Sequence, residues 1–145
     1  MQQEKVVLFG YNPESPWVDE AETRALEQSS MAKYPLARVR GAAEKAAREA
    51  LAQLEDRTDS LLVHFDVDVI DYDDFPAGDV PHYQGLGFDE ALTALHVFLA
   101  SPKFAGLVIT EFNANRDPEG RLAGRLVEAL SEALSVRPAS FSPGQ

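Results

Sequence analysis

Three short apolar runs, separated by segments with helical spacing, limit the folds open to this chain. The runs cover residues 5–10 (KVVLFG), 61–67 (LLVHFDV) and 105–110 (AGLVIT). Runs of this length and composition are typical of strands that are buried in a sheet. Strands that alternate with helices form a parallel sheet covered by helices. We therefore expect an α/β fold with a parallel sheet.

The segments between the runs predict helices over 17–29, 39–54 and 88–100, and a short strand over 31–36. The clearest helix, 39–54, carries alanine and leucine at intervals of three and four residues. A last helix is expected to begin at Pro118, capped by Asp117. Its buried side is expected to consist of four leucines: Leu122, Leu126, Leu130 and Leu134.

Size and composition exclude several classes of protein. A chain of 145 residues fits one domain, which we expect over 1–136, followed by a frayed, Pro/Ser-rich tail over 137–145. The absence of cysteine excludes disulfides, thiolate zinc sites and cysteine nucleophiles. The net charge of −11 disfavours nucleic acid and suits a cationic ligand or metal ion. No apolar run is long enough for a membrane span, and the N-terminal residues show no signal-peptide pattern, so a cytoplasmic protein is expected.

Two aspartates at the end of the second apolar run are the strongest candidates for chemistry. Asp66 and Asp68 lie two residues apart, and side chains of a strand alternate, so both are expected to point the same way. Their Cα atoms would lie roughly 6.6 Å apart. Two carboxylates this close repel each other unless a cation or a proton lies between them. A hard ion such as Mn²⁺ or Mg²⁺ fits oxygen ligands, whereas the alternative is a solvated pair at a strand end.

Four further residues are candidates, Glu111 for substrate binding and three others for accessory roles. His64 shares the direction of the two aspartates; it is either a third ligand or, more commonly for this position, a hydrogen-bonded core histidine. Asp71 is expected to brace the following loop by accepting backbone N–H bonds, and His82 lies in the same loop. Glu111 ends the third run, where its carboxylate suits a guanidinium group. The other loop acids are expected to be surface charge: Asp73, Asp74 and Asp79.

Three segments resemble the ureohydrolase family of arginases, agmatinases and formiminoglutamases. Residues 61–92 resemble its S-F-D-x-D-x-x-D-P strand end, Pro/Gly loop, G-G-[LIV] turn and helix. Residues 106–117 (GLVITEFNANRD) resemble its [DM]-x-E-x-N-P-x-x-D segment, and residues 6–12 (VVLFGYN) its I-G-[LI]-R strand. The resemblance therefore covers nearly the whole chain.

The resemblance implies the C-terminal half of a three-layer α/β/α fold and a binuclear Mn²⁺ centre. In the family this centre hydrolyses a C–N bond of a guanidinium or amidine, so a small cationic substrate is implied. Asp66 matches a carboxylate that bridges the two metal ions, and Asp68 matches a terminal metal ligand. Glu111 matches the carboxylate that pairs with the substrate guanidinium.

Departures from the family pattern leave the activity open. His64 stands where the family has Ser or Asn, and Tyr72 and Ala114 replace prolines. The G-G-D-H and D-x-H-x-D segments, which supply the other four metal ligands, do not occur in these 145 residues. We expect this chain alone to bind metal weakly and to be inactive unless a complementing chain or segment supplies them.

Two other functions compete with this one. The first is a free-standing, non-catalytic arginase-like domain for binding or assembly, such as a homo-oligomer formed at a sheet edge. The second is a haloacid-dehalogenase-like phosphatase, in which D-x-D also ends a buried strand and Asp66 would be the nucleophile. Against the phosphatase, the G-T-[LV] sequence expected after D-x-D is absent.

Overall fold

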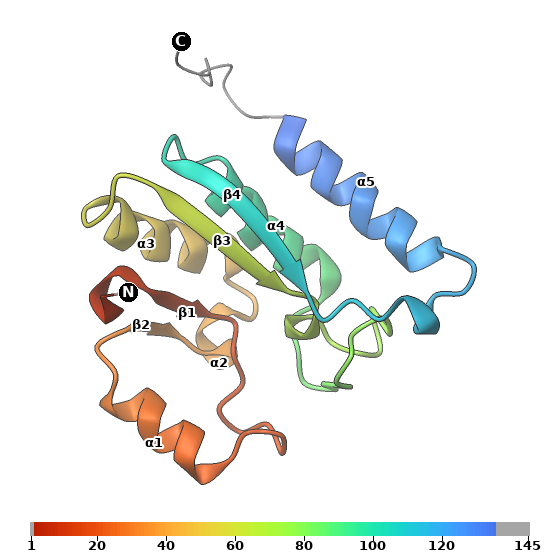
Figure 1. Ribbon diagram of the computed structural model, residues 1–145, viewed down its shortest axis with the longest axis horizontal. Coiled ribbons are helices and arrows are strands. Elements are labelled where there is room, and N and C mark those ends of the chain that lie inside the picture. Colours follow the sequence, from red (N-terminus) through yellow and green to blue (C-terminus); the bar gives the residue numbers. More distant parts are fainter. Residues whose placement is uncertain (1, 136–145) are drawn as a thin grey trace.

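The computed structural model describes residues 2–135, in which helices and strands alternate as expected. The strands are β1 (Val7–Phe9), β2 (Ala32–Tyr34), β3 (Leu61–Asp66) and β4 (Phe104–Thr110). The helices are α1 (Glu20–Gln28), α2 (Leu36–Val39), α3 (Ala43–Glu55), α4 (Phe88–Leu99) and α5 (Arg121–Ser135). Short 3₁₀ turns cover Gln3–Lys5, Val67–Val69 and Ala114–Arg116. The α/β class and the short strand β2 are thus confirmed (Figure 1).

The four strands form two parallel pairs, β1 with β2 and β3 with β4. Each pair is joined by a helix, α1 in the first pair and α4 in the second, which makes two β-α-β units. In the second pair Asp66 lies opposite Thr110, so both strands end at the same level. The residues that follow β3 and β4 therefore emerge together, where ligands gather in parallel sheets.

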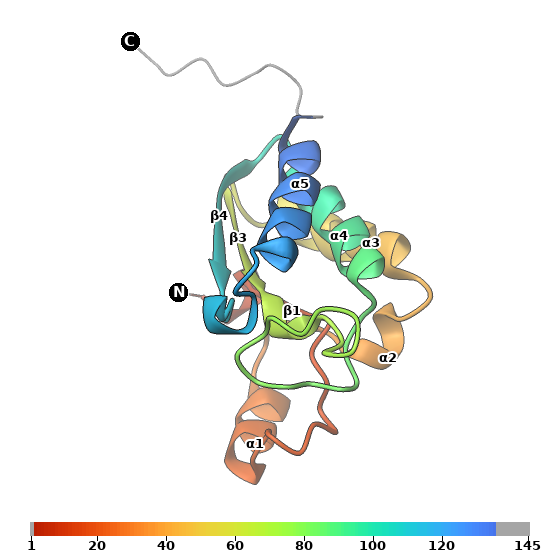
Figure 2. The same ribbon diagram turned by 90° about the vertical axis from the view of Figure 1, so that its right-hand side faces the viewer.

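Helices α3, α4 and α5 lie on one side of the strands (Figure 2). The buried alanines of α3 face α4, and buried side chains of both helices join Phe65 of β3 in one core. Side chains of a strand alternate between its two faces. Leu62 and Val108, which are 71% and 44% exposed, therefore mark an uncovered face of the β3–β4 pair in the described residues. Every helix within 2–135 is too short or too polar to cross a bilayer.

The expected helix over 39–54 is interrupted near its start. The chain ends α2 at Val39 and begins α3 at Ala43. Between them Gly41 has a φ of +75°, a left-handed conformation that stops a helix and favours glycine. The prediction of one continuous helix over 39–54 was therefore wrong for residues 40–42, which are not helical.

The last helix also differs in its start and in its buried face. It begins at Arg121 rather than at Pro118, although the Asp117 carboxylate still accepts N–H bonds from Leu122 and Ala123 at 3.1 and 2.8 Å. Leu134 is 39% exposed, and Ala133 takes the buried position in its place. The tail expected over 137–145 lies outside the described residues.

Asp74 is exposed, as expected of a surface charge, and it also caps a helix. Its Oδ2 accepts a hydrogen bond of 2.7 Å from the N–H of Phe88, the first residue of α4. The preceding Gly87 has no side chain to do this. Asp74 also pairs with Arg125 of α5 at 3.1 Å, and the Arg125 guanidinium lies over the Phe88 ring. The carboxylate thus connects the loop after β3 to two helices.

Replacing Asp74 with alanine is expected to lower the free energy of unfolding by about 1 kcal/mol near neutral pH. The Phe88 N–H bond, and then Arg125, hold the pKa of Asp74 below its ordinary value of 3.8. The stabilisation is therefore present above that ordinary value and is lost as the pH falls through the lower folded value. Urea unfolding from about pH 7 to about pH 2 measures this. Asp73→Ala, at an exposed neighbour, is the control. A difference between wild type and Asp74→Ala that persists at the lowest pH would contradict the assignment.

Candidate active site

Asp66 is the last residue of β3, and the chain then enters the 3₁₀ turn Val67–Val69. Its Oδ1 accepts a hydrogen bond of 2.9 Å from the N–H of Asp68. The sequence-based strand continued to Val67, so the separation expected for an extended chain does not apply to Asp68. The two aspartates are neighbours across a tight turn and not across one pleat of a strand.

Within the described residues, Asp68 carries the only buried side-chain nitrogen or oxygen atom without a hydrogen-bond partner. Its Oδ2 accepts a hydrogen bond of 3.0 Å from the N–H of Val80, whereas its Oδ1 is buried without a hydrogen-bond partner. Gly78 lies against this oxygen so closely that a Cβ at position 78 would overlap it. A buried carboxylate oxygen without a donor is costly, and a bound cation would remove that cost.

The surroundings of Asp68 place the candidate residues in one electrostatic cluster. Burial raises the pKa of the Asp68 carboxyl above its ordinary value. The Val80 N–H opposes this shift, the negative charge of Asp66 adds to it, His82 opposes it, and Glu111 adds to it. The negative charges of Asp66 and Glu111, at the carboxyl ends of β3 and β4, thus both act on Asp68, an arrangement that favours a positive ligand.

Glu111 follows β4 with a φ of +61°, an unusual conformation for a residue other than glycine. The Glu111 carboxylate is exposed, whereas hydrogen bonds to the loop after β3 hold its backbone in place. The Glu111 carbonyl accepts the N–H of Asp79 at 2.9 Å, and the Asn113 N–H donates to the Ala77 carbonyl at 2.8 Å. The Asn113 side chain donates to Asp79 Oδ1 at 2.8 Å. These bonds fix the two loops that carry Asp68 and Glu111 against each other.

The three accessory candidates, His64, Asp71 and His82, lie in different environments. His64 is exposed, with its Nε2 2.7 Å from Thr110 Oγ1, so the hydrogen bond is confirmed but the expected core position was wrong. His64 lies on the face of β3 that the helices do not cover. Asp71 braces the loop as expected, because its carboxylate accepts the N–H groups of Asp73 at 3.0 Å and Gly85 at 3.2 Å. His82 lies with its Nδ1 3.2 Å from Ser15 Oγ.

The donor set fits a cation only in part. The unpartnered oxygen of Asp68 and the nearby carboxylate of Asp66 are ligands that Mn²⁺ prefers. Within residues 2–135, however, no three His, Cys, Asp or Glu side chains are grouped closely enough to hold a metal ion. The two aspartates are therefore candidate ligands only, and the described residues contain no complete metal site.

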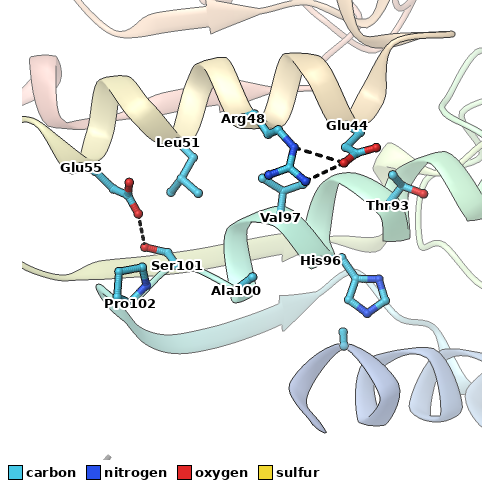
Figure 3. Close-up of a pocket in the computed structure, with 11 residues that line it drawn as sticks. Glu44, Arg48, Leu51, Glu55, Thr93, His96, Val97, Ala100, Ser101 and Pro102 are labelled. Atoms are coloured by element: carbon cyan, nitrogen blue, oxygen red, sulfur yellow. Dashed lines mark hydrogen bonds and ion pairs between the residues drawn. The ribbon is translucent and has the colours of Figure 1, made fainter. Parts of the chain in front are cut away.

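A hollow of about 510 Å³ lies between the helices, away from Asp68. Figure 3 shows Leu51 of α3 and Val97 of α4 along it, with Arg48 bonded to Glu44 and Ser101 bonded to Glu55. Its lining residues come from α3, α4, α5 and the segment before β4, and none of them belongs to the loops after β3 and β4. It takes no part in the cluster around Asp68.

Comparison with known proteins identifies the family to which this chain belongs. The family model described as "Arginase family" matches residues 1–134. The chain therefore belongs to the arginase family. No curated protein matches it significantly.

Solved structures of this family share the fold. Arginase from Bacillus caldovelox is 25% identical with a TM-score of 0.81, over 96% of this chain and 45% of that one. Arginase from Bacillus subtilis is 23% identical with a TM-score of 0.78, over 94% of this chain and 46% of that one. Formiminoglutamase from Trypanosoma cruzi, whose structure contains Mn²⁺, is 18% identical with a TM-score of 0.79, over 95% and 47%. The chain thus spans less than half the length of these structures.

Proposed function

We propose that this chain supplies the C-terminal part of a Mn²⁺-dependent ureohydrolase site, which hydrolyses a guanidinium or amidine C–N bond once the rest of the site is present. One observation carries the proposal: a buried, unpartnered carboxylate oxygen of Asp68 lies in a cluster with Asp66 and Glu111. Membership of the arginase family supports the reaction class. It also leaves the dehalogenase-like phosphatase without support.

Each acid of the cluster has a separate role in this proposal. Asp66 and Asp68 would hold Mn²⁺, since hard oxygen ligands suit that ion. Bound Mn²⁺ supplies a water of lowered pKa and polarises the scissile carbon. The exposed Glu111 carboxylate binds the substrate guanidinium by two parallel hydrogen bonds. The backbone bonds between Glu111 and Asp79 and between Asn113 and Ala77 hold the segment after β4 against the loop after β3.

The uncovered face of β3–β4 supports a partner that completes the site. Leu62 and Val108 expose apolar surface there, and His64 lies on the same face. Exposed apolar surface of this kind marks an interaction site in many proteins. We propose that a further segment or a separate chain, which also provides the remaining metal ligands, covers this face. A cytoplasmic location remains a prediction.

Metal analysis of the purified chain tests the incomplete site. After incubation with Mn²⁺ and gel filtration, the chain is expected to retain far less than the roughly two ions of a binuclear centre, because two carboxylates do not satisfy such ions. Asp68→Asn is expected to remove the residual binding seen by equilibrium dialysis, whereas Asp73→Asn leaves it unchanged. Retention of about two ions per chain would overturn the claim that the chain alone is incomplete.

The alternative of a non-catalytic assembly domain rests on the same exposed face. In a homo-oligomer, Leu62 and Val108 of one copy would be covered by another copy, with no need for metal. The two functions differ in what they require of Asp66, since only hydrolysis depends on its carboxylate.

A further inference from the structure

The segment after β4 contacts the loop after β3 through side chains as well as through its backbone. The Tyr72 hydroxyl accepts a hydrogen bond from Nη1 of Arg116, and the Arg116 guanidinium also lies over the Tyr72 ring. Arg116 Nη2 donates to the Asp79 carbonyl at 3.2 Å, and the Asn113 side chain donates to Asp79 Oδ1 at 2.8 Å. We call these four residues, Tyr72, Asp79, Asn113 and Arg116, the loop clamp.

Asp79 lies at the centre of the loop clamp. Its N–H donates to the Glu111 carbonyl at 2.9 Å, whereas its carbonyl accepts from Arg116 and its carboxylate accepts from Asn113. Arg116 in turn bonds to two separate points of the loop after β3, at residues 72 and 79. The position of each segment therefore depends on the other, and the bond from Asp79 reaches Glu111 itself.

The loop clamp acts on a backbone that needs support. Glu111 has a φ of +61°, and a residue other than glycine keeps such a conformation only where the surrounding contacts hold it. The hydrogen bond from the Asp79 N–H to the Glu111 carbonyl is a contact of this kind. Loss of the side chains that hold Asp79 would therefore release Glu111 toward a more favourable conformation.

Both segments lack a stiffening residue that the family pattern contains. Tyr72 and Ala114 replace prolines, and a proline restricts the backbone even before a loop has folded. Tyr72 is itself a member of the loop clamp, and Asn113 and Arg116 lie on either side of Ala114 in the sequence. Hydrogen bonds between the two segments thus occur at the places where this chain has lost its prolines.

We propose that Arg116 and Asp79 are positioning residues, which hold Glu111 in its left-handed conformation and thereby set how tightly its carboxylate binds a guanidinium group. The first part of this proposal concerns the chain alone. The second part rests on the proposed function, because it requires a completed site. Arg116 and Asp79 are exposed and take no part in the hydrophobic core, so variants at either position are expected to fold.

Hydrogen exchange of single amides, measured by NMR on the full chain without metal, tests the first part. Arg116→Met keeps the length of the side chain but removes its donors, and it is expected to speed exchange of the Asp79 N–H about threefold to tenfold. Amides within β3 and β4 are expected to keep their exchange rates. Arg24→Met changes an exposed arginine that pairs with Glu20 in α1, and this matched control is expected to alter none of these rates.

A second variant shows whether the clamp acts as a unit. Tyr72→Phe removes the hydroxyl that Arg116 donates to, and adding it to Arg116→Met is expected to change the exchange of the Asp79 N–H little further. Unchanged exchange of the Asp79 N–H in Arg116→Met would overturn the proposal. Equal acceleration throughout β3 and β4 would also overturn it, because the change would then be a general loss of stability.

Steady-state kinetics of the completed protein tests the second part. Arg116→Met is expected to raise KM for a guanidine about threefold to tenfold, with kcat within about twofold and the Mn²⁺ content unchanged, because Glu111 and not the metal ligands loses its support. Arg116→Lys restores a donor and is expected to recover part of the affinity. An unchanged KM in a variant whose Asp79 N–H exchanges faster would refute the positioning role. If the completed protein hydrolyses no guanidine, the proposed function fails, and the exchange measurement alone decides whether the clamp holds Glu111.

Discussion

Phe75→Ala is expected to lower the free energy of unfolding by about 3–5 kcal/mol, the largest stability effect we foresee. Phe75 is 1% exposed although it lies in a loop. Its ring stacks on Phe88 of α4 at 5.3 Å and lies 6.3 Å from Phe112 beyond β4. Removing the ring leaves a cavity between the loop after β3, α4 and the exit of β4. Urea unfolding followed by circular dichroism measures the loss.

Two controls separate the cavity from general damage. Phe75→Leu retains most of the buried volume, so a loss below about 1.5 kcal/mol is expected. Val127→Ala removes apolar atoms at a position that is 61% exposed, and its effect is expected to stay within about 0.5 kcal/mol. If Phe75→Ala behaved like Val127→Ala, the loop would not be part of the core.

Asp66→Asn is expected to reduce hydrolysis by more than about 100-fold in the completed protein, since loss of even an outer-shell partner of a metal site changes metal affinity or activity about 10- to 100-fold. The completed protein is obtained by co-expression with a fragment that carries the other metal-ligand motifs of the family. Release of urea or ammonia from guanidines and amidines measures the activity. The amide keeps the acceptor for the Asp68 N–H, so the fold is expected to survive.

Asp73→Asn is the matched control for this experiment, because it changes an exposed acid of the same loop. It is expected to leave the activity unchanged. If Asp66→Asn retained full activity, the carboxylate would not be a metal ligand. If the wild-type protein showed no hydrolysis with any completing fragment, and Asp66→Asn left its oligomeric state unchanged, the non-catalytic domain would be the better description.

The regular elements could be predicted because their signals are local. The runs around Leu8, Val63 and Val108 are apolar over the length of a strand, and each lies in a strand of the structure. The parallel pairing followed from the helices between them. Parallel pairing also predicts that Asp66 and Glu111 lie at the same end of the two strands, because each ends or follows its strand.

The details of the site could not be predicted because they depend on contacts between distant residues. The capping role of Asp74 could not be predicted, because nothing in its sequence neighbourhood indicates that Phe88 and Arg125 approach it. Val67, the last residue of the expected strand, instead begins the turn that carries Asp68. In this turn the Asp68 N–H donates to Asp66, and the Asp68 carboxylate accepts the N–H of Val80. Ser15 gave no signal at all, because its partner His82 is in another loop.

The backbone at Glu111 has a consequence for the balance between folding and chemistry. A left-handed residue other than glycine carries a torsional cost of about 1–2 kcal/mol. A chain shaped by folding alone would be better served by glycine at this position. Glutamate there places an acid directly after β4 at the expense of an easier backbone, and strained residues of this kind are concentrated at functional sites.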